Sequence, residues 1–176
     1  MYEKFGQFIN GNWSPSSNKE TYEVINPATE EILGHASKAT SVDVDKALKS
    51  AEKGLQVWKK TTPWDRSYIL RRIADKLREK KDVLAKWMTL ENGKPLAEGV
   101  GETNGAADIF EWNAEETKRI FGQTIESRFE DTRVHVYYQP VGVVAALSPW
   151  NFPLILAARK ISTALAAGCS VIIKPD

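Results

Sequence analysis

Residues 141–173 read VGVVAALSPWNFPLILAARKISTALAAGCSVII and decide the fold class. The run 141–147 is apolar without polar alternation, which favours a strand buried on both faces, as in a parallel sheet. A mostly apolar helix is predicted over 152–167, Gly168 ends it, and 170–173 forms a second apolar strand. Strand, helix and strand in this order make a βαβ unit, whose right-handed crossover leaves the strands parallel. The sequence therefore predicts an α/β fold.

Several helices are predicted before this unit. Thr40 can cap the first one, with Asp43 completing a capping box, and Thr62 precedes a proline suited to the first helical position of the second. The Asn92-Gly93 pair ends the following helical stretch. Residues 95–121 are predicted to be helical as well, although each glycine there costs about 1 kcal/mol relative to alanine in a helix interior. These glycines are Gly99, Gly101 and Gly105.

Two hairpins are predicted outside the helices. Asn10-Gly11 suits the two-residue turn of a short N-terminal hairpin, and alternating side chains after residue 122 predict a two-stranded arm. We divide the chain into an N-terminal hairpin with helices (1–122), the arm (123–139) and the first βαβ unit of a parallel sheet (140–176). Because the pattern stops within or just after the second strand of that sheet, we expect an incomplete fold.

The composition excludes several classes of protein. The chain has 176 residues with 24 basic and 23 acidic side chains, so its net charge of +1 disfavours a nucleic-acid or membrane-surface partner. No apolar run approaches the length of about 20 residues that a membrane span needs. The N-terminus lacks a secretory pattern and there is one cysteine, so we expect a cytoplasmic protein.

The turn between the two strands is the main candidate site. Residues 148–153 follow the carboxyl end of the first strand, where open α/β sheets bind their ligands. Pro149 and Pro153 stiffen the turn, so the side-chain amide of Asn151 could donate a hydrogen bond to a developing oxyanion. The alternative is that Asn151 caps the helix, a position that asparagine favours.

Two basic residues are further candidates. Lys174 follows the second strand and could bind ribose hydroxyls or a phosphate of a nucleotide, or it could be an ordinary solvated lysine. Arg159 lies in the helix between the strands, where it could pair with a substrate carboxylate or extend to solvent.

Other reactive residues give weaker signals. Cys169 lies between Gly168 and Ser170 at the start of a strand, which is more typical of a small buried side chain than of a nucleophile. His35 and His135 are too far apart to make a metal-site signature, so we expect no metal. No serine lies in a nucleophile elbow, which disfavours an α/β-hydrolase.

Taken together, several motifs resemble those of the NAD(P)-dependent aldehyde dehydrogenases. The specific ones are PWNFP at 149–153, ALAAGC at 164–169 and Lys174-Pro175 after it. The likeness extends along the chain through FINGNW at 8–13, NPAT at 26–29, NGKP at 92–95, EW and AE within 111–115, and PVGV at 140–143.

The resemblance implies a chemistry. In that family a cysteine thiolate attacks the aldehyde, hydride passes to NAD or NADP, and a glutamate activates the water that hydrolyses the thioester. Asn151 is then the catalytic oxyanion donor. The resemblance also makes 140–176 the first unit of a nucleotide-binding sheet. The nucleotide-binding residues that it implies are Ser148, Pro149, Trp150, Asn151, Lys174, Pro175 and Asp176. The family's nucleophile and base fall beyond residue 176, and Cys169 matches neither.

Within the family the chain looks most like the succinate-semialdehyde dehydrogenases, in which the arginine that matches Arg159 contacts the substrate carboxylate. The implied protein is a homo-oligomer that oxidises a small aldehyde, with NAD and NADP both left open. We expect the 176 residues alone to be inactive. The rival interpretation is a non-catalytic module that retains only oligomerisation or nucleotide binding.

Overall fold

The structure, a computed structural model, describes residues 6–176 as a mixture of helices and short strands. The strands are β1 Gln7–Ile9, β2 Asn12–Ser14, β3 Thr21–Ile25, β4 Ile32–Ser37, β5 Gln123–Glu126, β6 Arg133–Val136, β7 Val143–Leu147 and β8 Ser170–Lys174. The helices are α1 Ser41–Trp58, α2 Pro63–Glu79, α3 Lys81–Asn92, α4 Leu96–Glu116 and α5 Pro153–Ala166, with the 3-10 turn η1 Thr117–Arg119. The N-terminal hairpin and the βαβ order match the sequence predictions, whereas the helix predicted over 95–121 ends earlier, with α4 stopping at Glu116 and a 3-10 turn following it. The antiparallel pair of β3 with β4 was not predicted.

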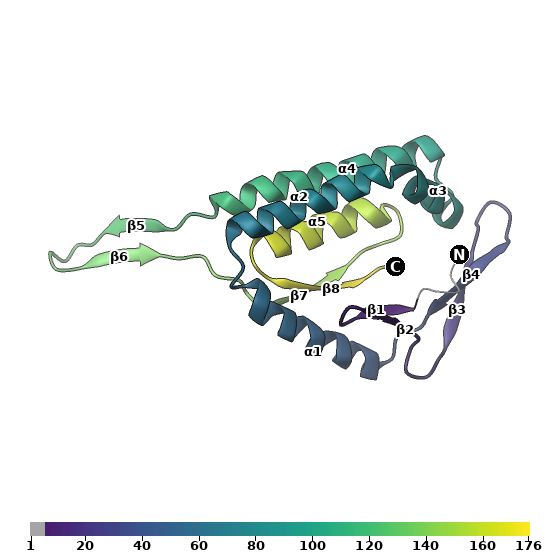
Figure 1. The fold of residues 1–176 in the computed structure, drawn as a ribbon, viewed down its shortest axis with the longest axis horizontal. Helices are drawn as coiled ribbons and strands as arrows, with labels where there is room; N and C mark the ends of the chain where they lie inside the picture. Colours follow the sequence, from purple (N-terminus) through teal and green to yellow (C-terminus); the bar gives the residue numbers. More distant parts are fainter. Residues whose placement is uncertain (1–5) are drawn as a thin grey trace.

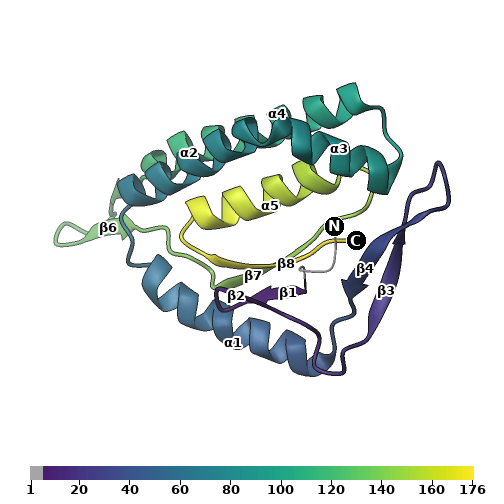
Figure 2. The ribbon, with the colours of Figure 1, turned by 45° about the vertical axis from the view of Figure 1, so that its right-hand side comes forward.

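The βαβ unit is parallel, as expected. Val143 on β7 lies opposite Ser170 on β8, and Leu147 lies opposite Lys174. Helix α5 lies between this sheet and the helices α2 and α4, while α1 lies on the other side of the sheet (Figures 1 and 2). The carboxyl ends of both strands therefore meet at one edge, beside the start of α5.

The expectation that the first strand is buried on both faces is wrong for the residues that the structure describes. Leu147 is 62% exposed, and Ala145 is exposed too. The reason is that α5 and α1 lie on opposite faces of the pair, and α1 lies mainly against β8, which leaves β7 less covered.

The core lies between the helices and is made mostly of alanine, which lets helix backbones approach closely. Its buried members are Leu70, Ala74, Ala106, Ala107, Phe110, Ala114, Ala158 and Ala166. Two of the glycines in α4 serve the same close approach. A Cβ on Gly99 would lie 2.9 Å from the carbonyl oxygen of Ala85, and one on Gly105 would lie 3.0 Å from Cδ1 of Ile155. Close packing against α3 and α5 therefore offsets their low helix propensity.

Local signals set the start of α1 and the turn of the first hairpin. Asn10 and Gly11 have φ angles of 53° and 78°, the positive values that their turn requires. Thr40 caps α1 in a capping box, and the Asp43 carboxylate accepts the backbone N–H groups of Ser17 at 3.0 Å and of Thr40 at 3.1 Å. These hydrogen bonds, that from Ser17 above all, hold the pKa of Asp43 well below its usual range.

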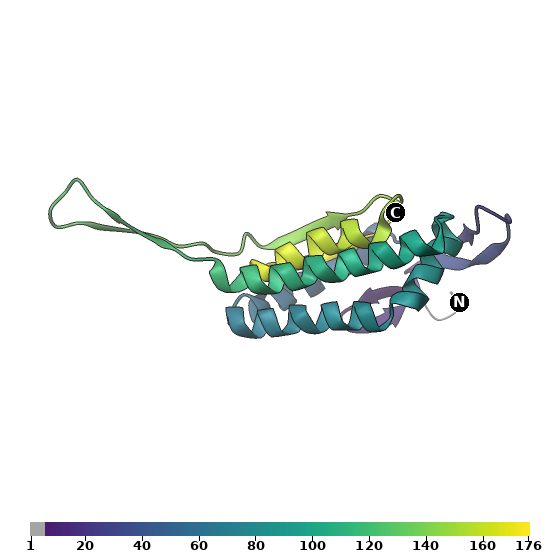
Figure 3. The same cartoon turned by 90° about the horizontal axis from the view of Figure 1, so that it is seen from above.

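The predicted arm is an antiparallel pair, β5 with β6, in which Gln123 lies opposite Val136. It projects away from the helices as a long hairpin (Figures 1 and 3). Ile125 and Val134 on its strands are 45% and 40% exposed. The arm therefore presents exposed strand edges and apolar side chains at a distance from the sheet.

Candidate functional site

The turn that joins β7 to α5 exposes the side chain of Asn151 at the strand edge. Trp150 beside it is 65% exposed. The helix cap is Phe152, and no side chain bonds the first turn from that position. The alternative role of Asn151 as the helix cap is therefore wrong. Within residues 6–176 its carboxamide makes no hydrogen bond, so its N–H groups are free to donate.

The backbone of this turn, in contrast, is held from outside. The Lys94 ammonium donates to the carbonyl oxygen of Asn151 at 3.1 Å and lies 4.8 Å from the centroid of the Phe152 ring. Asn92 Nδ2 donates to the carbonyl oxygen of Trp150 at 2.8 Å. Both donors come from the end of α3 and the loop after it, which is far from the turn in sequence.

A buried carboxylate completes this contact. Glu102 on α4 forms an ion pair with Lys94, and the two side chains are 2% and 7% exposed. Its Oε1 accepts the backbone N–H groups of Leu154 at 2.8 Å and Ile155 at 3.1 Å. The first turn of α5 has free N–H groups and the positive end of the helix dipole there, so a carboxylate stabilises it.

The ends of the two strands are joined at the same edge. The Ser148 N–H donates to the carbonyl oxygen of Lys174 at 3.1 Å. The side chain of Lys174 is exposed, and so are Pro175 and Asp176. Ser148 itself is 6% exposed, and its Oγ has no hydrogen-bond partner among the described residues. The structure thus brings Ser148, Asn151 and Lys174 to one edge.

Arg159 lies apart from this group. It is exposed on α5, six residues after Pro153 and hence about 9 Å further along the helix axis at 1.5 Å per residue. The neighbouring Lys160 ammonium donates to the carbonyl oxygen of Leu147. This contact ties the last residue of β7 to α5.

Cys169 is remote from the edge. It is 3% exposed and precedes β8, so it lies about 16 Å from Lys174 at the usual rise of about 3.3 Å per strand residue. Arg66 lies against the same end of the sheet, where a Cβ on Gly168 would lie 2.4 Å from the Arg66 guanidinium. Burial lowers the pKa of Arg66. These contacts favour a structural role for this end of the βαβ unit.

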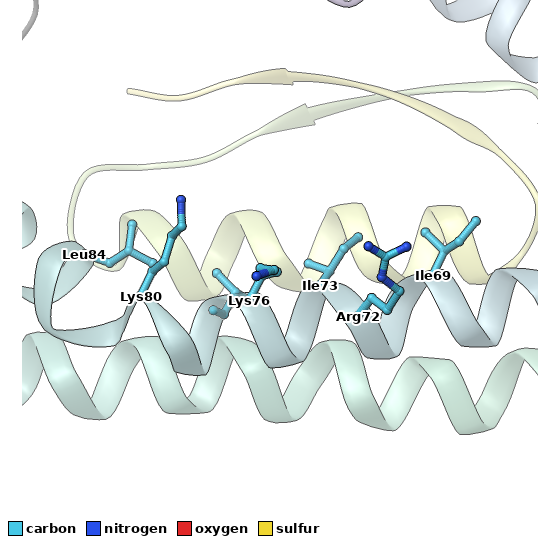
Figure 4. Close-up of a pocket in the computed structure, with 7 residues that line it drawn as sticks. Ile69, Arg72, Ile73, Lys76, Lys80 and Leu84 are labelled. Atoms are coloured by element: carbon cyan, nitrogen blue, oxygen red, sulfur yellow. The ribbon is translucent and has the colours of Figure 1, made fainter.

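Other features of the described residues offer no competing site. A pocket of about 500 Å³ beside α2 is lined only by aliphatic and basic side chains (Figure 4). They are Ile69, Arg72, Ile73, Lys76, Leu77, Lys80 and Leu84. Between residues 6 and 176 there is no cluster of three metal-ligating side chains, and no helix is long and apolar enough to cross a membrane.

Sequence reasoning missed Asn92, Lys94 and Glu102 as neighbours of the turn. One signal was present, because Glu102 occurs three residues after Gly99 and four before Ala106, both of which are buried on α4. A charged residue at a core-facing position is rare unless it is paired. The identity of its partners could not be read from that pattern.

Comparison with known proteins identifies the family. The model of the aldehyde dehydrogenase family matches residues 13–176. The glutarate-semialdehyde dehydrogenase of Pseudomonas putida is 46% identical over 168 residues, which cover 96% of this chain and 35% of that protein. The NADP(+) succinate-semialdehyde dehydrogenase of Escherichia coli is 45% identical over 95% of this chain and 35% of its own length.

A solved structure gives the same result. Betaine aldehyde dehydrogenase from Staphylococcus aureus in complex with NAD+ superposes with a TM-score of 0.92 and 36% identity, covering 96% of this chain and 34% of that one. The chain therefore spans about a third of the length of the relatives it matches. On the family match along most of its length, the chain belongs to the aldehyde dehydrogenase family.

Proposed function

We propose that this chain supplies the oxyanion donor and the first nucleotide-binding edge of an NAD(P)-dependent dehydrogenase that oxidises a short, carboxylate-bearing aldehyde. The observation that carries the proposal is the exposed, unbonded carboxamide of Asn151 at the end of β7. The names of the Pseudomonas putida and Escherichia coli relatives support the substrate class, since both are semialdehyde dehydrogenases. We also propose the cytoplasm as its compartment.

The chemistry assigned to Asn151 follows from its position. When a nucleophile attacks an aldehyde, the carbonyl oxygen becomes an anion, and a donor already in place stabilises that charge without reorganisation. The Asn151 carboxamide can do so because its turn is fixed while its N–H groups have no partner within residues 6–176. A single donor of this kind contributes about 100- to 1,000-fold to turnover.

The strand edge suits a dinucleotide. Lys174 offers an exposed cation at the end of β8, where its carbonyl oxygen accepts from the Ser148 N–H at the start of the turn. The nucleotide, when bound, supplies the hydride acceptor. The residues proposed to hold it are Ser148, Pro149, Trp150, Asn151, Lys174, Pro175 and Asp176. NAD and NADP are both named with relatives, so either is proposed.

Arg159 is proposed to attract the substrate carboxylate, which is supported by its exposure on α5. The test compares succinate semialdehyde with butanal as substrates, and NAD with NADP as cofactors. It uses the protein expressed from the whole coding sequence that contains these residues. We expect a higher kcat/KM for the semialdehyde and loss of that preference in Arg159→Met. Arg72→Met is the matched control, because Arg72 is an exposed arginine on α2. An equal preference in Arg159→Met and the control contradicts the assignment.

The parallel pair β7 and β8 supports a further proposal, that 140–176 is the first unit of a Rossmann-like sheet. The exposed face of Leu147 supports an incomplete fold within these residues. The division at 1–122, 123–139 and 140–176 belongs to the same proposal. The exposed edges of the β5–β6 arm support an assembly role for 123–139 in a homo-oligomer.

The second candidate function is that of a non-catalytic module. It is favoured because the chain covers only about a third of the length of each relative. The 176-residue chain has one cysteine, and that cysteine is buried away from the strand edge. We therefore expect no aldehyde oxidation by this chain alone. Turnover by the isolated chain contradicts that expectation, whereas dinucleotide binding or self-association without turnover in the encoded protein favours the module.

A further inference from the structure

We propose that Lys94 and Glu102, together with Asn92, are positioning residues that set the direction of the Asn151 side chain for oxyanion binding. The proposal rests on the proposed function of Asn151. None of the three touches the reacting atoms in this scheme. Each acts through the backbone of the turn, and together the three residues form a turn clamp.

The turn clamp fixes both peptide groups that flank Asn151. The carbonyl of Trp150 belongs to the peptide before Asn151 and accepts from Asn92 at 2.8 Å. The carbonyl of Asn151 belongs to the peptide after it and accepts from Lys94 at 3.1 Å. Two fixed peptide planes determine φ and ψ of the residue between them, and hence the direction of its Cα–Cβ bond. The Cα–Cβ bond is thereby directed without a hydrogen bond from the side chain itself.

Glu102 links this backbone to α5. One carboxylate oxygen accepts the N–H groups of Leu154 and Ile155, and the other meets the Lys94 ammonium. The same buried carboxylate thus holds the helix that follows the turn and orients the cation that holds the turn itself. Because Glu102 and Lys94 are 2% and 7% exposed, water screens their pairing little.

Such an arrangement matters for catalysis more than for binding. Oxyanion stabilisation depends on donors held in place before the charge develops, and a misplacement of about 1 Å can cost about 100-fold in rate. A hydrogen bond from one Asn151 N–H to the protein would also orient the carboxamide, but it would take up one of the two N–H donors. Holding the backbone instead leaves that donor available to the substrate.

The test is a double-mutant cycle that measures kcat with a semialdehyde substrate. It uses the protein expressed from the whole coding sequence that contains these residues. We expect kcat to fall about 10- to 100-fold in Lys94→Met and several-fold in Asn92→Ala, with the dinucleotide Kd unchanged. In an Asn151→Ala background each change should lower kcat less than about 2-fold, because residues that act as a unit are not additive. Lys38→Met is the control, since Lys38 pairs with Glu20 on the surface.

Stability is measured alongside, because Lys94→Met leaves Glu102 buried without its cation. If that variant does not fold, the neutral pair Lys94→Met with Glu102→Gln replaces it, since the glutamine oxygen can still accept from α5. Asn92→Ala removes a solvent-exposed hydrogen bond and gives the cycle with little structural risk. Two results overturn the turn clamp. One is that the effects on kcat are fully additive with Asn151→Ala. The other is that kcat is unchanged both in Asn92→Ala and in a folded Lys94 variant. An unaffected Asn151→Ala overturns the proposed function instead.

Discussion

The glycines of α4 give a test of how closely α3 and α4 must approach to place Glu102. Gly99 and Gly101 lie two residues apart in one helix but face different surroundings. A Cβ on Gly99 would meet the Ala85 backbone, at 2.9 Å from its oxygen and 3.1 Å from its Cα, whereas a Cβ on Gly101 would meet nothing within 4 Å. We therefore expect Gly99→Ala to destabilise the protein and Gly101→Ala to stabilise it.

The magnitudes follow from two opposing terms. Alanine gains about 1 kcal/mol over glycine in a helix interior at both positions. Overpacking against a backbone that cannot move away costs about 1–3 kcal/mol, and it applies only to Gly99 because Gly101 faces open space. The net change is a loss of about 1 kcal/mol for Gly99→Ala and a gain of about 1 kcal/mol for Gly101→Ala. This difference of about 2 kcal/mol corresponds to about 4–8 °C in Tm.

Thermal unfolding followed by circular dichroism measures both variants against the parent protein. Helix propensity is matched between them, so the sign of the difference reports the packing term alone. If Gly99→Ala raises Tm as much as Gly101→Ala does, the close contact between α3 and α4 is not rigid. The placement of Glu102 by that contact would then lose its support.

Two other features of the chain give predictions. Hydrogen bonds from Ser17 and Thr40 lower the pKa of Asp43. Its carboxylate therefore stabilises the fold at pH values above its pKa in the unfolded chain, which is about 4, and this stabilisation is lost as the pH falls toward its pKa in the folded protein. Asp43→Asn should therefore lower Tm near neutral pH, with a gap to the parent that narrows in melts below about pH 4; a gap independent of pH refutes this. Lys174→Ala should weaken dinucleotide binding about tenfold in a fluorescence titration, from the loss of one charged hydrogen bond, while Lys60→Ala, also an exposed lysine, should not.

Local chemistry explains which parts of the fold could be predicted. Asn10-Gly11, the Thr40 cap and the Gly168 stop act over a few residues, and the structure places each at the predicted boundary. The parallel sheet was also predictable, because a βαβ crossover has one hand. The burial of the first strand was not, since it depends on where the covering helices lie, and α1 lies mainly against β8 rather than β7.

The candidate site likewise has a part that could be predicted from the sequence and a part that could not. The position of Asn151 at a strand end follows from the sequence, because the apolar run and the prolines mark the turn. Its surroundings do not, because Lys94 and Glu102 lie more than 45 residues away along the chain and contact the turn and the start of α5 only in the folded structure. Hydrogen bonds between distant segments carry no periodic signal in sequence.

The most direct test of the role of Asn151 is its replacement by alanine. Both kcat and the dinucleotide Kd are measured in the protein expressed from the whole coding sequence. We expect kcat to fall about 100- to 1,000-fold while nucleotide affinity changes little, as the loss of one oxyanion donor predicts. Parent-like turnover in a folded Asn151→Ala protein would contradict the assignment of that carboxamide to the reacting oxygen.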